Sequence, residues 1–243
     1  MQDYIAKGYA QKLSDEEASK SGPRTWYLPH FAVISSNKPN NCKVRIVFDA
    51  AAEHGETSLN KNLLQGPDYT DSLVGVLLRF REENVALVGD IEGVIHQVKV
   101  RPENQDSLRF LWWSGSIDEA PQEYAMTVHM FGAADSPCSA NSILLRTADD
   151  NEGSFDPVTT DTLRHNFYVD DPLKSVPTSE EAITLMEQLI ELCAKGGFNL
   201  TKFVSNNRKV WSAILRGKRA DPSLDVNLDE VPIDRALGVR WHI

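Results

Sequence analysis

The sequence predicts an α+β fold, and three observations carry this prediction. Runs of β-branched and aromatic residues at 30–35 and 43–49 flank a turn-rich stretch, which is typical of a hairpin. Longer stretches at 71–82, 137–148 and 179–195 are predicted helices, and the last has the clearest apolar stripe. Strands and helices are interleaved, but nothing requires a parallel sheet, so α+β is the safer class.

Capping signals support two of these helices. Thr178 and Glu181 have the spacing of a capping box at the start of the last helix, and the Gly196-Gly197 pair is expected to end it. Asp71 is expected to cap the first helix, since its carboxylate can accept from the free amides there.

Further strands are expected between the helices. They lie at 84–100, which reads as strand, turn and strand, and at 108–114, 124–128, 166–176 and 199–205. The stretch at 166–176 reads as two short strands around an acidic turn. The segment from 149 to 164 is expected to be a loop, and no internal repeat is present.

The composition is that of a globular protein. The chain has 243 residues, of which 41% are apolar and 25% charged. Three cysteines without a CxxC pair argue against a disulfide scaffold and against a zinc module. Neither an apolar run of about 18 residues nor a signal-peptide pattern occurs, so an intracellular chain that is not secreted and contacts no membrane is expected.

The net charge of −10 argues against a nucleic-acid partner, because phosphates favour basic surfaces. The charges are segregated, however. Nine acids and two bases lie between 149 and 181, whereas six bases and no acid lie between 198 and 220. Each run taken alone is most simply a solvated face.

Three aspartates are the most informative residues for chemistry. Asp90 closes an apolar run, and Asp170 and Asp171 occupy the turn of a predicted hairpin 80 residues later. Adjacent carboxylates repel each other, so a third beside them is unfavourable unless a cation neutralises the cluster. Magnesium prefers hard oxygen ligands and suits such a cluster. An Asp-Asp pair alone is more often a solvated turn.

The segment Asn166-Phe167-Tyr168-Val169-Asp170-Asp171 resembles the catalytic Tyr-x-Asp-Asp hairpin of retroelement reverse transcriptases. Other blocks similar to this family follow in the family's order: 43–49 and 58–60 (fingers), 89–98 (first palm motif), 131–137 (second), 196–202 (fourth) and 237–241 (primer grip). The amino-acid sequence at 27–30, 48–52 and 166–171 is most similar to that of the BEL/Pao class of long-terminal-repeat retrotransposons.

The resemblance implies the fingers and palm of a right-hand polymerase, with the palm a ferredoxin-like antiparallel sheet packed on helices. It implies fingers at 1–65 and 99–135, and palm at 66–98 and 136–243. A thumb, a connection region and an RNase H domain, which the family carries further on, are expected to lie outside this chain. A retroelement particle in the cytoplasm, with nuclear access left open, is the implied location.

The implied activity is RNA-directed DNA polymerisation, with two Mg²⁺ ions, or Mn²⁺ in their place, as cofactor. Asp90 and Asp170 would be the main metal ligands, assisted by Asp171 and the Ile91 carbonyl. Lys202 would give a proton to the leaving pyrophosphate. The implied partners are an RNA or DNA template with its primer and deoxynucleoside triphosphates.

The resemblance also implies contacts to the nucleotide and the primer. The nucleotide set is Arg45 and Lys38 on the phosphates, with Ile95, Phe131 and Gly132. The primer and template set is Tyr168, Leu237, Gly238 and Trp241. Ile95 stands where the family usually carries an aromatic ring under the sugar, so weaker rejection of ribonucleotides is expected.

Simpler interpretations stay open. Arg45 can be an ordinary strand cation, Gly132 a turn residue, and Lys202 part of a solvated basic face. Gly89 and Gly93 are expected to loosen the strand around Asp90, and Pro172 removes an amide donor after the aspartate pair. The alternative function is therefore a catalytically inactive remnant, acting at most as a nucleic-acid or protein binding module.

Overall fold

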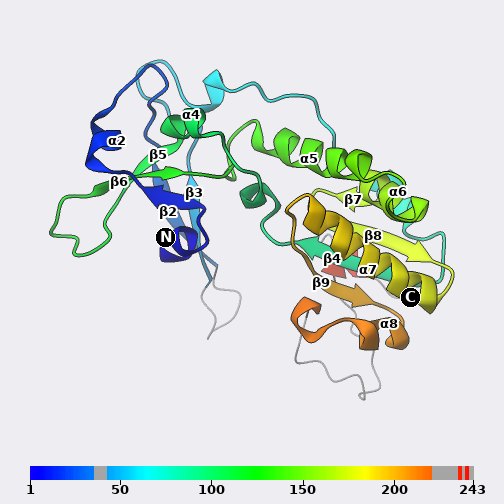
Figure 1. Ribbon diagram of the computed structural model, residues 1–243. Helices are drawn as coiled ribbons and strands as arrows, with labels where there is room; N and C mark the ends of the chain where they lie inside the picture. The colour runs from blue at the N-terminus through cyan, green and yellow to red at the C-terminus, as the bar shows by residue number, and fades with distance from the viewer. Residues whose placement is uncertain (36–42, 221–234, 237–238, 241–243) are drawn as a thin grey trace. The chain divides into compact units, whose positions relative to one another are not determined.

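The computed structural model describes residues 1–35, 43–220, 235–236 and 239–240. Within them the chain forms two compact units, each built from two stretches of sequence. The first unit comprises Met1–Pro67 and Ile95–Ser139, and the second comprises Asp68–Val94 and Ala140–Ile243. Strands and helices of both units are labelled in Figure 1. The mixture of helices with antiparallel sheets confirms the predicted α+β class.

The first unit contains two small antiparallel sheets. One has the strand order β1-β6-β5, and the other is the hairpin β2-β3. The strands are β1 (Ala10–Lys12), β2 (His30–Ser35), β3 (Lys43–Phe48), β5 (Arg109–Trp112) and β6 (Gln122–Met126). The helices are α1 (Gln2–Ala6), α2 (Asp15–Ser19), α4 (Pro102–Gln105), and the 3-10 turns η1 (Asn60–Asn62) and η3 (Asp106–Leu108). The hairpin confirms the strands predicted at 30–35 and 43–49.

Aromatic rings form much of the first unit's core. Phe110 is fully buried and lies 5.1 Å from the ring of Phe48 and 5.7 Å from that of Tyr124, which stacks on it. Met126 and Met130 fill the space beside them. Burial of rings of this size supplies the largest share of the hydrophobic stabilisation in a unit with such short strands.

Arg109, at the start of β5, is the largest fully buried side chain, with 1% exposure. Its guanidinium donates to the backbone carbonyls of Glu17, Ala18 and Lys20, at the end of α2. It also donates to a carboxylate oxygen of Asp106 at 2.7 Å. These bonds give the carbonyls at the helix end a charged donor and tie α2 to the sheet.

His96 is the centre of a second aromatic group in the first unit. Its ring stacks on Tyr9 at 5.1 Å and meets the edges of Tyr4 and Phe131 at 5.1 and 5.2 Å. Burial, and then the charge of Lys7, lower the pKa of His96 to about 4. The imidazole is therefore neutral at pH 7 and packs as an aromatic ring.

We expect the first unit to lose stability in acid through His96. The folded-state pKa of about 4 lies below the ordinary 6.5, so the unfolded chain binds a proton more readily between these values. Its contribution is complete above pH 6.5 and falls by about 3 kcal/mol as the pH drops to 4. His96→Phe keeps the ring without titrating, so its urea unfolding free energy should fall less between pH 7 and 4. Parallel pH curves for the two proteins would contradict this.

The second unit is built on one four-stranded antiparallel sheet with the order β7-β8-β4-β9. Its strands are β7 (Phe167–Tyr168), β8 (Asp171–Val176), β4 (Val85–Ile91) and β9 (Leu200–Ser205). Its helices are α3 (Leu73–Arg79), α6 (Pro157–His165), α7 (Ser179–Lys195), α8 (Arg208–Ala213), the turn η4 (Arg216–Lys218), and most of α5 (Ser136–Asp150). The short strands β10 (Arg235–Ala236) and β11 (Val239–Arg240) form a separate antiparallel pair.

Helices cover this sheet. Helix α7 contacts β4, β8 and β9 and lies across the sheet in Figure 1. Helix α3 packs Val76 and Phe80 against Ala86 of β4 and Leu173 of β8. The Thr178 hydroxyl accepts from the Glu181 amide, which confirms the predicted cap of α7. The central strand β4, covered by helices and flanked on both edges, is thus a rigid place for side chains at its end.

Three local predictions are wrong. Residues 157–165 form α6 rather than a loop, because Pro157 occupies a helix start and its threonines pack inward. The second half of 84–100 forms the 3-10 turn η2 (Val94–Gln97) rather than a strand, since Gly93 turns the chain with φ +56°. Asp71 does not cap α3, which begins after Ser72; it accepts from Arg79 instead.

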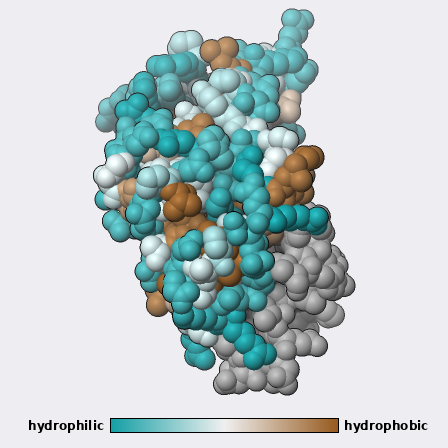
Figure 2. All heavy atoms as spheres, turned by 90° about the vertical axis from the view of Figure 1, so that its right-hand side faces the viewer, coloured by the Kyte–Doolittle hydropathy of each residue, from teal (hydrophilic) through white to brown (hydrophobic). Residues whose placement is uncertain are grey.

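The face in Figure 2 carries its apolar side chains in separate small groups among hydrophilic ones, which is ordinary for globular proteins. Within the described residues, every helix is too short or too polar to cross a bilayer.

Candidate active site

The structure brings the Asp90 and Asp170 segments together on the second unit's sheet. Asp90 lies near the end of β4, where it pairs with Thr201 of β9. The backbone N–H of the following residue, Ile91, donates to the Asp170 carbonyl at 2.8 Å. This bond fixes the hairpin turn against the end of β4, although 80 residues separate the two segments in the chain.

The hairpin that carries the aspartate pair is clamped at its base by Asn166. The Asn166 carbonyl accepts from the Leu173 amide at 2.8 Å, and its side-chain amide donates to the Leu173 carbonyl at 3.2 Å. Asn166 is fully buried, and its backbone N–H also donates to Thr162 of α6. The sequence motif contains this residue, but no role follows for it from sequence, since the clamp needs the tertiary partner.

The turn of this hairpin holds a strained residue. Tyr168 pairs with Asp171, so Val169 and Asp170 are the two central residues of the turn. Val169 has φ +60°, a left-handed conformation that crowds a β-branched side chain. Among the described residues, Val169 and Lys202 are the two that combine a side chain with positive φ. Both lie at this site, which is where folds commonly store backbone strain.

We expect Val169→Gly to raise the stability of the protein by about 1 kcal/mol. The left-handed conformation costs a β-branched residue roughly 1–2 kcal/mol, which exceeds the extra entropy that glycine loses on folding. Val169 is exposed, so little packing is lost with its side chain. Urea unfolding followed by circular dichroism measures the difference. A variant less stable than wild type would show that the turn is not strained.

Lys202 reaches the aspartates through an irregularity in β9. The pairing of β4 with β9 shifts register between Val88 and Asp90, and Lys202 has φ +51° at that place. Its ammonium lies 2.7 Å from a carboxylate oxygen of Asp90. A β-bulge redirects side chains in this way, and here it turns the lysine toward the carboxylates.

The pKa values of the aspartate pair show that this site is electrostatically unbalanced. Burial, followed by the charges of Asp170 and Asp90, raises the pKa of Asp171 to about 7. Burial and the charge of Asp90 also raise the pKa of Asp170, while Lys202 works in the opposite direction on both. One nearby ammonium thus leaves the carboxylates short of positive charge.

Gly89 and Pro172 lie close together in the sheet. A side chain at Gly89 would come within 3.2 Å of both the Phe203 ring and the Pro172 ring. Glycine therefore lets these two rings pack closely over the strand beside Asp90. Pro172 pairs with Phe167 across the hairpin, so it is accommodated in β8. The loosening that the sequence predicts for the strand around Asp90 stays a prediction, because packing distances do not measure it.

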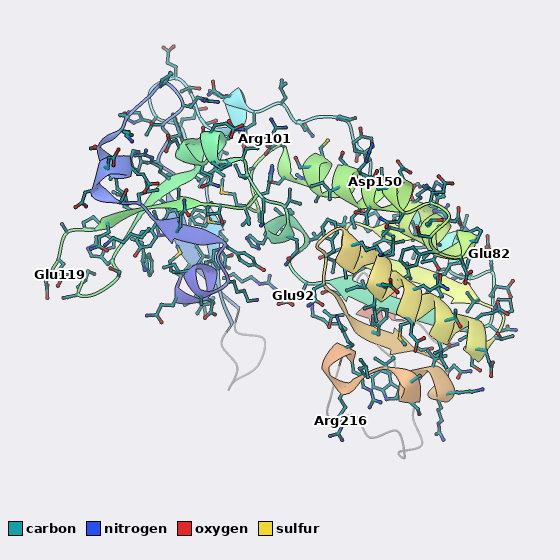
Figure 3. The ribbon with its side chains drawn as sticks, viewed as in Figure 1. Glu82, Glu92, Arg101, Glu119, Asp150 and Arg216 are labelled. Carbon is teal, nitrogen blue, oxygen red and sulfur yellow. The ribbon has the colours of Figure 1, made fainter. Side chains whose placement is uncertain are left out.

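Much of the basic run at 198–220 has partners within the protein. Lys218 donates to the Asn199 side chain at 2.6 Å, Lys209 pairs with Glu180, and Arg219 lies over the Trp211 ring at 5.3 Å. Asn199 in turn donates to Glu92, which follows β4 and is labelled in Figure 3 together with Arg216 of η4. The run is in large part a frame around β9 rather than a free basic face.

The donor chemistry at this site fits a divalent cation. Three carboxylates contribute hard oxygen ligands, and their mutual repulsion would be relieved by added positive charge. They are not arranged as a ready coordination shell, since no cluster of three or more metal-binding side chains occurs in the described part of the chain. Asp90 is instead in contact with Lys202.

Four of the remaining predicted residues lie in the first unit. Arg45 is exposed on β3, opposite Val33. Ile95 is 7% exposed, and Phe131 is 51% exposed with its ring against His96. Gly132 has φ +99°, and a Cβ there would lie 3.0 Å from the Phe48 carbonyl, so the position demands glycine.

The other predicted contacts have mixed positions. Tyr168 packs beside Leu173 in the hydrophobic cluster under α3, and the fully buried Ile91 side chain faces the core. Lys38, Leu237, Gly238 and Trp241 lie outside the described residues.

Solved structures with a similar fold come from foamy viruses. A foamy viral protease-reverse transcriptase in complex with double-stranded DNA matches over 82% of this chain, with a TM-score of 0.57 and 16% identity. The same kind of protein in complex with an RNA/DNA hybrid matches over 82%, with a TM-score of 0.56 and 16% identity. The native prototype foamy virus protein matches over 83%, with a TM-score of 0.57 and 15% identity. The chain thus shares part of a reverse transcriptase fold.

The similarity is one of structure, and it covers only a part of each foamy virus protein. The chain spans 28% of the first of these proteins and 22% of the other two. No protein-family model and no curated protein matches the sequence.

Proposed function

We propose that this chain is the fingers and palm portion of a reverse transcriptase that adds deoxynucleotides to a primer. The second unit would be the palm and the first unit the fingers, since the chain passes between them as those subdomains require. We also propose that its source is a retrotransposon of the BEL/Pao class, on the motif wording given above.

One observation carries the proposal. Asp90 and the Asp170-Asp171 turn are joined through the Ile91 to Asp170 backbone bond, on a sheet within a fold similar to solved reverse transcriptases. A fold alone does not specify chemistry, so the proposal depends on the approach of these two segments. Besides burial, the charges of Asp170 and Asp90 both raise the pKa of Asp171, and unfavourable interactions of this kind are common at functional sites.

Asp90, Asp170 and Asp171 would hold the magnesium ions. When bound, such ions activate an attacking hydroxyl and stabilise a leaving pyrophosphate. The protein's own contribution is to fix the carboxylates on a rigid strand end and a clamped hairpin. Lys202 would supply a proton near the leaving group, and Arg45 would bind the nucleotide's phosphates through its planar fork.

The partners would be a primer paired with an RNA or DNA template. Two of the similar foamy virus proteins are bound to double-stranded DNA and to an RNA/DNA hybrid. Many lysine and arginine side chains of this chain already bond to other residues of the protein. We therefore expect its affinity for the nucleic-acid duplex to be weak and to fall steeply as the salt concentration rises.

Primer extension at low salt tests this function. The wild-type chain is incubated with a labelled primer on an RNA template and on a DNA template, with Mg²⁺, with Mn²⁺ or with EDTA. We expect templated incorporation with either metal and none with EDTA. Duplex binding without incorporation under any condition would favour the inactive remnant.

A further inference from the structure

We propose that the Lys202 ammonium is a built-in counter-ion of Asp90, which a divalent cation must displace to bind. This inference rests on the proposed function, because it concerns the same carboxylates. The bulge in β9 then has a role beyond strand pairing, because it positions the Lys202 ammonium to compete with a divalent cation for Asp90.

The geometry of Lys202 supports a specific placement. The register shift between β4 and β9 puts Lys202 in a left-handed conformation, which an ordinary strand residue avoids. A regular alternation along β9 would direct its side chain differently. The strain is therefore the cost of turning this side chain toward Asp90, with which it makes a 2.7 Å contact.

The contact between Lys202 and Asp90 competes with a divalent cation for Asp90, yet it is weak enough for the cation to displace it. The Lys202 side chain is 57% exposed, whereas that of Asp90 is 22% exposed. An ion pair with such an exposed ammonium is worth little on balance, because water replaces it at small cost. A doubly charged ion interacts with the same carboxylate about twice as strongly at equal distance. Its binding would therefore separate Lys202 from Asp90.

A nearby pair provides the matched control. Lys209 of α8 pairs with Glu180 of α7, in the same unit and with similar exposure of its side chain. Lys209→Met removes the same charge and the same kind of ion pair from a place away from the aspartates. Lys202→Met removes the proposed competitor, and Lys202→Gly does so while also relieving the left-handed strain.

Mn²⁺ binding to the full chain, measured by the electron paramagnetic resonance of free Mn²⁺, tests the proposal. We expect the Kd to fall about tenfold in Lys202→Met and Lys202→Gly, and to stay unchanged in Lys209→Met. Equal or weaker binding by both Lys202 variants, with wild type still binding, would overturn the inference and leave the proposed function standing. Absence of Mn²⁺ binding in wild type and all variants would overturn both.

A second readout follows the lysine itself. Acetylation of Lys202 by a small amine-reactive reagent, read by peptide mass spectrometry, should increase severalfold when Mn²⁺ is added to the wild-type protein. Lys209 serves as the internal reference and should not respond. Unchanged reactivity of Lys202 at saturating Mn²⁺ would overturn the proposed displacement.

Discussion

Asp170→Asn is expected to reduce nucleotide incorporation by at least about 100-fold, because one anionic metal ligand is lost from the proposed site. Asparagine has nearly the same shape, and the backbone bond from Ile91 to residue 170 uses the carbonyl, which remains. The hairpin should therefore keep its place. Single-nucleotide incorporation under saturating Mg²⁺ measures the loss.

Asp170→Asn should be more stable than the wild-type protein, although it incorporates nucleotides more slowly. The pKa of Asp170 is raised by burial and by Asp90, so its charged form is unfavourable at pH 7 and its removal stabilises the fold. Asp161→Asn is the control: Asp161 is exposed on α6, 3.9 Å from His165, and its loss should leave incorporation unchanged. Equal incorporation by Asp170→Asn and wild type would exclude the polymerase function.

Arg109→Met is expected to lower the free energy of unfolding by about 3–5 kcal/mol, the largest stability effect that we predict. The variant removes the guanidinium donor from the carbonyls of Glu17, Ala18 and Lys20, which lie beside the buried Arg109 side chain. It also removes the partner of Asp106. Since these groups link α2 to β5, the N-terminal segment should become protease-sensitive as well.

The control for this prediction is Arg146→Met. Arg146 pairs with Asp150 one turn along α5, and both side chains are well exposed. Exposed pairs of this type contribute under about 1 kcal/mol, so urea unfolding should change little. A similar small change in Arg109→Met would mean that the α2 carbonyls find water or other donors.

Much of the fold follows from local signals. The cap at Thr178 and the glycines after α7 predict that helix to the residue, because helix ends depend on near neighbours. The hairpin β2-β3 is equally local. Helix α6 was missed because its interior is rich in threonine, whose preference for strands is outweighed when the side chains are buried in packing.

Some features of the candidate site also follow from local sequence, whereas others depend on tertiary contacts. The spacing of Tyr168, Asp170 and Asp171 identifies a hairpin turn with an aspartate pair, and the ordered blocks nominate Asp90 as their partner. No local pattern announces the Asn166 clamp, because its partner Leu173 is brought opposite it by the strand pairing. The basic run looked like a free face for a related reason: its internal partners are distant in sequence.

The sequence by itself determined the α+β class and most element positions, and it nominated the three carboxylates of the proposed site, because side-chain type and short-range spacing encode these. Only the tertiary structure decided how the charges are balanced. A one-residue shift between β4 and β9 turns Lys202 onto Asp90, and the packing of Phe203 and Pro172 explains Gly89. Register and contact are properties of paired strands, and a single strand's sequence does not specify its partner's alignment.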